Sequence, residues 1–258
     1  MKEAASLNAW IDRNENLSAL FLLAKKHFIE EARAWGVTHK VMGIILVMPF
    51  VIAIMGVLTA LMGKDAYKWL TREDGFAESL QVIFYFVAFI LCLAITRWQW
   101  KSDHRLVAVL YTALCVGLFF LTGEEINWGQ RIIVWETSPS FAAINKQGET
   151  NLHNIYGVGA TFKWVQLLVG AYGCLLPLAV LRWGVPERFR HLVSWVIPPL
   201  ALIPYFFFLF AWRLFRNFFE EPEGFYFVIA EYNEVMELIL AAGLLLFMVY
   251  QMRRLKKA

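Results

Sequence analysis

Acidic and amide side chains gather in four short stretches of this chain, and one histidine lies among them. The stretches cover residues 73–78, 123–131, 145–154 and 231–237. Carboxylates beside an imidazole can transfer protons near neutral pH, because burial raises the pKa of a carboxyl group and histidine already titrates there. Amides can hydrogen-bond a polyol, a sugar or a phosphate. Together, these groups predict a site for acid–base chemistry on a polar ligand.

Ten residues in these stretches are predicted to act on the ligand or to bind it. They lie near the ends of different apolar segments, so a helical bundle would bring them together. A glutamate would act as general base, and the histidine would act as the acid or would orient the base. The predicted catalytic residues are Glu78, Glu125, His153 and Glu234. The predicted ligand-binding residues are Gln130, Arg131, Asn145, Gln147, Asn151 and Asn154.

A metal site is a second interpretation of the same residues. Glu149 and His153 are four residues apart, which places them on one face if that segment is helical. With Glu125 they form a candidate ligand set for a divalent metal ion. Oxygen ligands predominate in this set, which favours magnesium, manganese, calcium or iron over zinc. The paired Glu-x-x-His units of helical di-metal sites do not occur in the sequence.

Both polar patterns also have structural explanations. Acids in 231–237 can pair with an arginine and lock helices together, and the candidate partners are Arg131, Arg213 and Arg216. An amide-rich stretch such as 145–154 is also typical of an ordinary solvated loop. The sequence alone leaves these explanations open.

The elements that must position these residues are long and apolar. Six stretches approach the ~20 residues that a helix needs to cross a hydrocarbon core of ~30 Å. With 59% hydrophobic and 17% charged residues, the chain has too little polar surface for a soluble domain. We therefore predict an all-α, polytopic integral membrane protein. The predicted spans are 41–63, 77–96, 106–122, 162–182, 192–212 and 229–250.

Charged residues separate by sign between the predicted spans. Segments 1–40, 97–105, 182–190 and 251–258 hold 16 Lys and Arg but only 7 Asp and Glu. The opposite segments, apart from Lys163, hold 7 bases and 14 acids. Because lysine and arginine are retained on the cytoplasmic side, we predict that both termini are cytoplasmic.

The chain divides into three predicted parts. Residues 1–40 form a cytoplasmic segment, residues 41–250 form the membrane domain with an outward-facing loop at 123–161, and residues 251–258 form a basic tail. In the first part, apolar residues recur at steps of three and four, which predicts an amphipathic helix on the inner leaflet or against a partner protein. These apolar residues are Leu17, Leu20, Phe21, Ala24, Phe28, Ala32 and Trp35.

Two strings carry a resemblance to other proteins. GEEINWGQR (123–131) and NKQGETNLHN (145–154) resemble a pattern in uncharacterised bacterial polytopic membrane proteins. In that pattern an acidic pair precedes Trp-Gly-Gln-Arg, and a later amide-rich run ends in Leu-His-Asn. The resemblance fits a bacterial cytoplasmic (inner) membrane and transfers no activity, substrate or cofactor.

Membrane ceramidase-like hydrolases are similar to this chain in size and multi-span build. They hold zinc with several histidines, whereas His153 is the one histidine in a predicted outer segment. The other four, His27, His39, His104 and His191, fall on the predicted cytoplasmic side. A three-histidine zinc site is therefore not expected.

Three functions are compatible with these patterns. The first is an enzyme that acts at the outer leaflet on a lipid or on a lipid-linked head group. The second is a membrane protein with a carboxylate-rich metal site, and the third is a transporter or a non-catalytic subunit of a membrane complex. No inverted repeat is detectable, which disfavours a secondary transporter. We adopt the enzyme hypothesis, with membrane lipids as partners and no nucleic-acid partner.

Overall fold

The computed structural model describes residues 22, 25–102 and 104–256, and six of its helical segments are long and apolar enough to cross a membrane. Within these residues no β-strand forms, and Asn145 and Ile155 make an isolated antiparallel bridge. The long helices are α2 (His39–Leu61), α4 (Phe76–Lys101), α5 (Arg105–Glu125), α8 (Val158–Trp183), α10 (Ile203–Phe218) and α11 (Tyr226–Leu255). The short helices are α3 (Lys64–Thr71), α6 (Gln130–Ile133), α7 (Pro139–Ala142) and α9 (Arg190–Val196).

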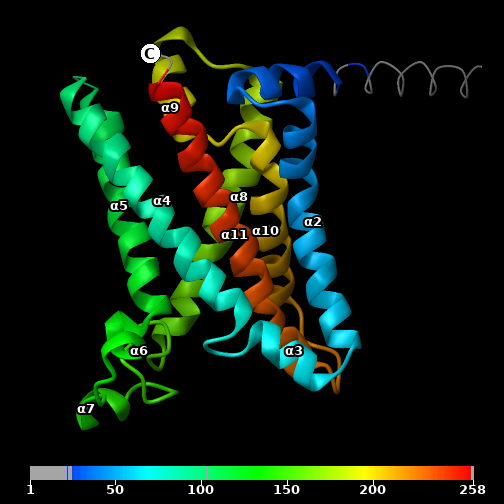
Figure 1. Ribbon diagram of the computed structural model, residues 1–258, viewed down its shortest axis with the longest axis vertical. Helices are drawn as coiled ribbons and strands as arrows, with labels where there is room; N and C mark the ends of the chain where they lie inside the picture. Colours follow the sequence, from blue (N-terminus) through cyan, green and yellow to red (C-terminus); the bar gives the residue numbers. More distant parts are fainter. Residues whose placement is uncertain (1–21, 23–24, 103, 257–258) are drawn as a thin grey trace, which may run out of the picture.

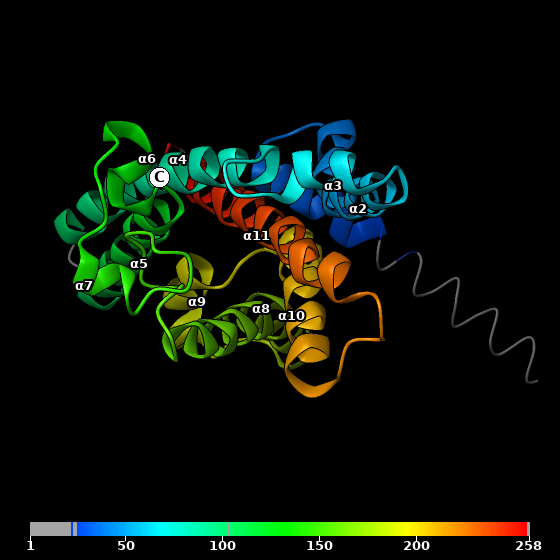
Figure 2. The ribbon, with the colours of Figure 1, turned by 90° about the horizontal axis from the view of Figure 1, so that it is seen from below.

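Helix α11 is the centre of the bundle. It packs against α4, α10 and α2, and 67% of its apolar stretch is buried, against 28–39% in the other five candidate spans. The pairs α4–α5 and α8–α10 lie on different sides of α11 (Figure 2). The bundle therefore has two arms that the central helix joins.

The two ends of the bundle differ. The described N-terminal helical residues and the end of α11 lie at one end, and α3, α6 and α7 lie at the other (Figure 1). The amide-rich loop therefore lies at the end opposite the basic connections. The structure is helical over the described residues, as predicted, and six helices long and apolar enough to cross a membrane support a polytopic protein.

The predicted span 192–212 is broken in the structure. Ile197 is extended (φ −84°, ψ 129°), as expected for a residue before proline, and Pro198 and Pro199 separate α9 from α10. Helix α9 turns away to pack on α5, where the hydroxyl of Tyr111 donates to the carbonyl of Trp195 at 2.7 Å. The break therefore joins the two arms near the end of the bundle where α11 ends.

The predicted amphipathic N-terminal segment is described in part. Residues 25–35 are helical, and Ala32 and Trp35 are buried. The ring of Trp35 lies 5.0 Å from that of Tyr250 in α11, so this part of the helix packs on the bundle itself. Leu17, Leu20, Phe21 and Ala24 lie outside the described residues, and the interfacial helix over them stays a prediction.

We expect Gly170→Ala to lower the thermal midpoint of the detergent-solubilised protein by several degrees. A Cβ on Gly170 would lie 2.7 Å from the backbone nitrogen of Phe210, and backbone cannot move aside as a flexible side chain can. Overpacking of this kind costs about 1–3 kcal/mol. The matched control is Gly43→Ala in α2, where a Cβ meets nothing within 4 Å. Equal midpoints in a thermal scan of both variants would contradict the close α8–α10 packing.

Candidate functional site

A cavity of about 1180 Å³ lies between the two arms. Its wall at the α3 and α6 end is polar, and its deeper wall is apolar. The predicted catalytic residues Glu78, Glu125, His153 and Glu234 all line it, although they come from different elements. The apolar wall includes Tyr85, Ala113, Leu114, Gly117, Leu118, Val165, Val169, Leu240 and Leu244.

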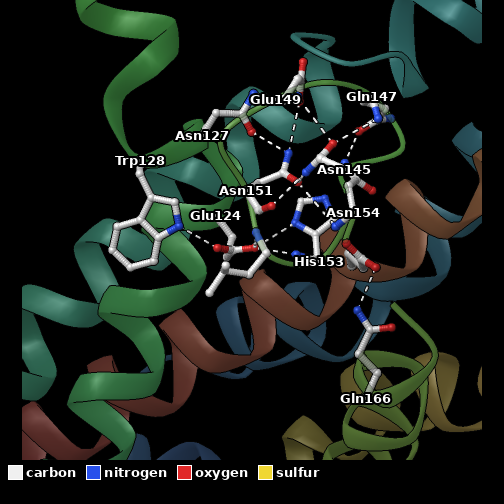
Figure 3. Close-up of polar contacts among 12 residues, drawn as sticks. Glu124, Asn127, Trp128, Asn145, Gln147, Glu149, Asn151, His153, Asn154 and Gln166 are labelled. Atoms are coloured by element: carbon white, nitrogen blue, oxygen red, sulfur yellow. Dashed lines mark hydrogen bonds and ion pairs between the residues drawn. The ribbon is translucent and has the colours of Figure 1, made fainter. Parts of the chain in front are cut away.

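Glu124, rather than its neighbour Glu125, is the carboxylate that binds His153. Its Oε2 lies 3.1 Å from His153 Nδ1 and accepts the backbone N–H groups of Leu152 and His153, each at 2.8 Å. Its Oε1 accepts the indole N–H of Trp128 (Figure 3). Glu124 is only 3% exposed, and four donors offset the cost of burying its charge.

A strained turn after α5 positions one of these donors, the indole N–H of Trp128. Asn127 (φ 48°) and Trp128 (φ 54°) both adopt the left-handed conformation, which side chains other than glycine rarely take. Gly123 leaves room for the indole, because a Cβ there would lie 2.9 Å from the ring of Trp128. Such strain persists only where surrounding contacts fix it, and here it aims Trp128 at Glu124.

An amide network holds the loop that carries His153 (Figure 3). Asn151 donates to Asn127 Oδ1 at 2.8 Å and to Glu149 Oε2 at 3.0 Å, and Asn127 donates to the same Glu149 oxygen at 2.8 Å. Asn145 donates to the backbone carbonyl of Asn151 at 2.8 Å and to its side-chain oxygen at 3.0 Å. Asn127, Asn145 and Asn151 are buried. Their amides therefore bind the loop and position the imidazole.

The other predicted ligand-binding residues are placed differently. Gln130 donates to Thr137 Oγ1 at 2.9 Å and accepts the N–H of Thr150 at 2.9 Å, so it also ties the loop together. Gln147 and Asn154 line the cavity and hydrogen-bond each other. The side chain of Arg131 lies outside the part of the chain that the structure describes. Ligand binding by all six residues stays a prediction.

The acids of α11 have distinct surroundings. Glu237 forms an ion pair with Arg213 at 3.3 Å and accepts the amide N–H of Gln166 at 2.7 Å. The structural alternative, a carboxylate that pairs with an arginine between helices, thus describes Glu237. Glu234 instead accepts the amide N–H of Gln81 at 3.2 Å.

Glu78 and Glu125 both lie where a helix ends at the cavity. Glu78 lies in the first turn of α4 and accepts the backbone N–H of Asp74. Glu125 is the last residue of α5 and is partly buried. The catalytic roles predicted for these two residues and for Glu234 stay predictions.

The predicted metal ligands do not form a cluster. Glu149 binds Asn127 and Asn151, and His153 binds Glu124. Among the described residues, no group of three or more His, Cys, Asp and Glu side chains could hold a metal ion. The arrangement therefore gives no support to the divalent-metal hypothesis at Glu125, Glu149 and His153.

The electrostatics of His153 favour a protonated ring. Burial by itself lowers the pKa of the imidazole, but the hydrogen bond to Glu124 and the charges of Glu237, Glu124 and Glu78 raise it. The net result is a pKa above the ordinary value of 6.5. Because Nδ1 faces Glu124 and no described residue binds Nε2, Nε2 is the ring atom that can exchange a proton in the cavity.

Sequence reasoning missed the role of Glu124 and of Trp128. A signal was present, because Glu124 and Trp128 are four residues apart at the end of an apolar stretch. The choice between Glu124 and Glu125 depends on where α5 ends, which the sequence does not reveal. Comparisons with family models, with curated proteins and with solved structures find no match for this chain.

We expect Glu124→Gln to lower the pKa of His153, because the substitution removes the charge that stabilises the imidazolium. The titration of the His153 side chain can be followed by nuclear magnetic resonance in detergent micelles. Protonation should be lost at lower pH in the variant than in the wild type. Glu125→Gln is the matched control, since the charges that raise the pKa of His153 come from Glu237, Glu124 and Glu78. Identical titrations in wild type and Glu124→Gln would contradict the pairing.

Proposed function

We propose that this protein is a membrane enzyme that acts on the head group of a lipid or of a lipid-linked substrate. His153 acts as general acid through Nε2, and Glu124 orients the ring and stabilises its charge. One of Glu78, Glu125 and Glu234 acts as general base. In this proposal both termini lie in the cytoplasm of a bacterial cell, and the polar end of the cavity faces outward from the inner membrane. The separation of basic from acidic segments supports this orientation.

The observation that carries this proposal is the amphipathic cavity with His153 at its polar end. From Glu237 to Leu244, both on the cavity wall, seven helical residues span about 10 Å. This stretch leads from buried charges to aliphatic side chains. A wholly polar substrate would leave the apolar wall without a partner, whereas a lipid matches both ends.

The wall between the two arms supports entry of a lipid from the bilayer. Below the stacked rings of Phe120 and Phe162, whose centroids are 6.0 Å apart, Gly117 on α5 and Val165 on α8 are exposed and line the cavity. The contact between Tyr111 and α9 closes the gap about 14 Å from Phe120, nearer the start of α5. Figure 2 shows α5 and α8 in different arms of the bundle.

The test is product formation from membrane lipids by protein in nanodiscs. Lipids are extracted after incubation and compared by mass spectrometry. We expect His153→Ala to lower the rate by a factor of about 10² to 10⁴, the usual contribution of general acid–base catalysis. Equal conversion by wild type and His153→Ala would contradict the role of His153. Absence of any conversion by wild type, with a lipid retained in the cavity, would favour a carrier or transporter instead.

A second variant tests the apolar end of the cavity in the same assay. A Cβ on Gly117 meets nothing within 4 Å, so the backbone there accepts a side chain, and Gly117→Leu adds an apolar side chain to a residue of the cavity wall. We expect this variant to stay folded and to lose both retained lipid and turnover. Gly43→Leu in α2 is the control, since its position is equally open but does not line the cavity. If Gly117→Leu behaves like Gly43→Leu, the lipid tail does not occupy this space.

A further inference from the structure

The start of α8 enters the cavity without a cap. Gly157, in the left-handed conformation (φ 84°), precedes the helix and gives no side-chain cap, and the N–H of Val158 donates to the backbone carbonyl of Ile155 at 3.1 Å. Gly157, Gly159 and Ala160 line the cavity. The first N–H groups of a helix have no partner within it and carry the positive end of its dipole. Such a helix start favours an anion, and phosphate is the usual one.

Two lysines add positive charge at this helix start. The ammonium of Lys146 lies 3.9 Å from the position of a Cβ on Gly159, and Lys163 follows Gly159 by one helical turn on the same face. Both line the cavity. Neither lysine forms an ion pair with any residue in the described ranges. Lys163 also lies within electrostatic reach of Arg213 and Arg216.

A buried guanidinium gives independent evidence for a missing ligand. Arg213 is 5% exposed and lines the cavity, and one of its terminal nitrogens binds Glu237. Its Nε has no hydrogen-bond partner among the described residues. Glu237 therefore does not saturate the guanidinium, and Arg213, which lines the cavity, keeps N–H groups that can bind a ligand oxygen.

The carboxylates on the opposite wall already have donors. Glu231 accepts the hydroxyl of Thr71 at 3.1 Å, and Glu234 accepts the amide of Gln81 at 3.2 Å. Glu237 is neutralised by Arg213. An anion bound at the α8 wall, beside Lys146 and Lys163, would therefore face carboxylates that are already hydrogen-bonded.

We propose that the start of α8, with Lys146, Lys163 and Arg213, binds the phosphate group of the lipid substrate. This inference rests on the proposed lipid enzyme and names the chemistry of its head group. A Cβ on Gly159 would lie 2.9 Å from the carbonyl oxygen of His153, so the helix start adjoins the residue that carries the acid. A phosphate held here lies beside the His153 ring, where a proton can be delivered to the head group.

Binding of three short-chain amphiphiles tests the inference. The probes are a short-chain phosphatidylglycerol, a short polyprenyl monophosphate, and a diacylglycerol that lacks phosphate, each titrated into purified protein in detergent. We expect a phosphate-bearing probe to bind more tightly than diacylglycerol, with Lys163→Gln and Lys146→Gln each weakening it about tenfold. Preference for the diester or for the monoester distinguishes a membrane phospholipid from a phosphorylated carrier lipid.

The controls separate charge from packing. Lys163→Arg keeps the charge and should keep the affinity, whereas Lys163→Gln should not. Lys101→Gln, at the far end of α4, should leave binding unchanged. The inference is overturned if diacylglycerol binds as tightly as both phosphate probes, or if Lys163→Gln and Lys146→Gln bind them like wild type.

Phosphate binding and lipid turnover can each be lost without the other, so the phosphate subsite and the enzyme are tested separately. Lysine-dependent binding of a phosphate lipid with no His153-dependent product would support the phosphate subsite and reject the enzyme. His153-dependent conversion of a lipid without phosphate, unaffected by Lys163→Gln, would support the enzyme and reject the subsite.

Discussion

The buried carboxylate of Glu124 is the constraint on which the polar end of this molecule depends. A negative charge at the C-terminal end of a helix opposes the helix dipole, and burial adds the cost of desolvation. Donors from Trp128, Leu152 and His153 offset both costs. Since two of these residues come from a segment nearly thirty positions later, satisfying one carboxylate brings the loop back over the end of α5.

The rest of the site follows from holding that loop in place. The left-handed turn at Asn127 directs the side chain of Asn127 into the amide network. Asn151 donates to that side chain, and Asn145 donates to the carbonyl of Asn151. These bonds fix the imidazole relative to Glu124 while its second nitrogen stays available. The bundle supplies the other half of the site, because its two arms diverge from α11 and leave an apolar space beneath the fixed polar group.

Features that are local in sequence could be predicted well. Six spans follow from apolar length alone, which bilayer thickness dictates. At Pro198 only a kink was foreseeable from the sequence, because tertiary packing decides that α9 turns towards α5. The general base was predicted among Glu78, Glu125 and Glu234, and Glu149 was the carboxylate expected beside His153. Glu124 forms the bond instead. It is next to Glu125 in the chain, and a shift of one residue rotates a helical side chain by about 100°.

The most direct test of the Glu124–His153 pair is a double-mutant cycle on the rate of lipid conversion. If Glu124 acts by orienting and charging His153, substituting Glu124 in a variant that already lacks the His153 side chain lowers the rate no further. We therefore expect the double variant Glu124→Gln, His153→Ala to convert lipid at the rate of His153→Ala alone. Losses that multiply, with the double variant slower than either single variant by the product of their effects, would contradict a paired function.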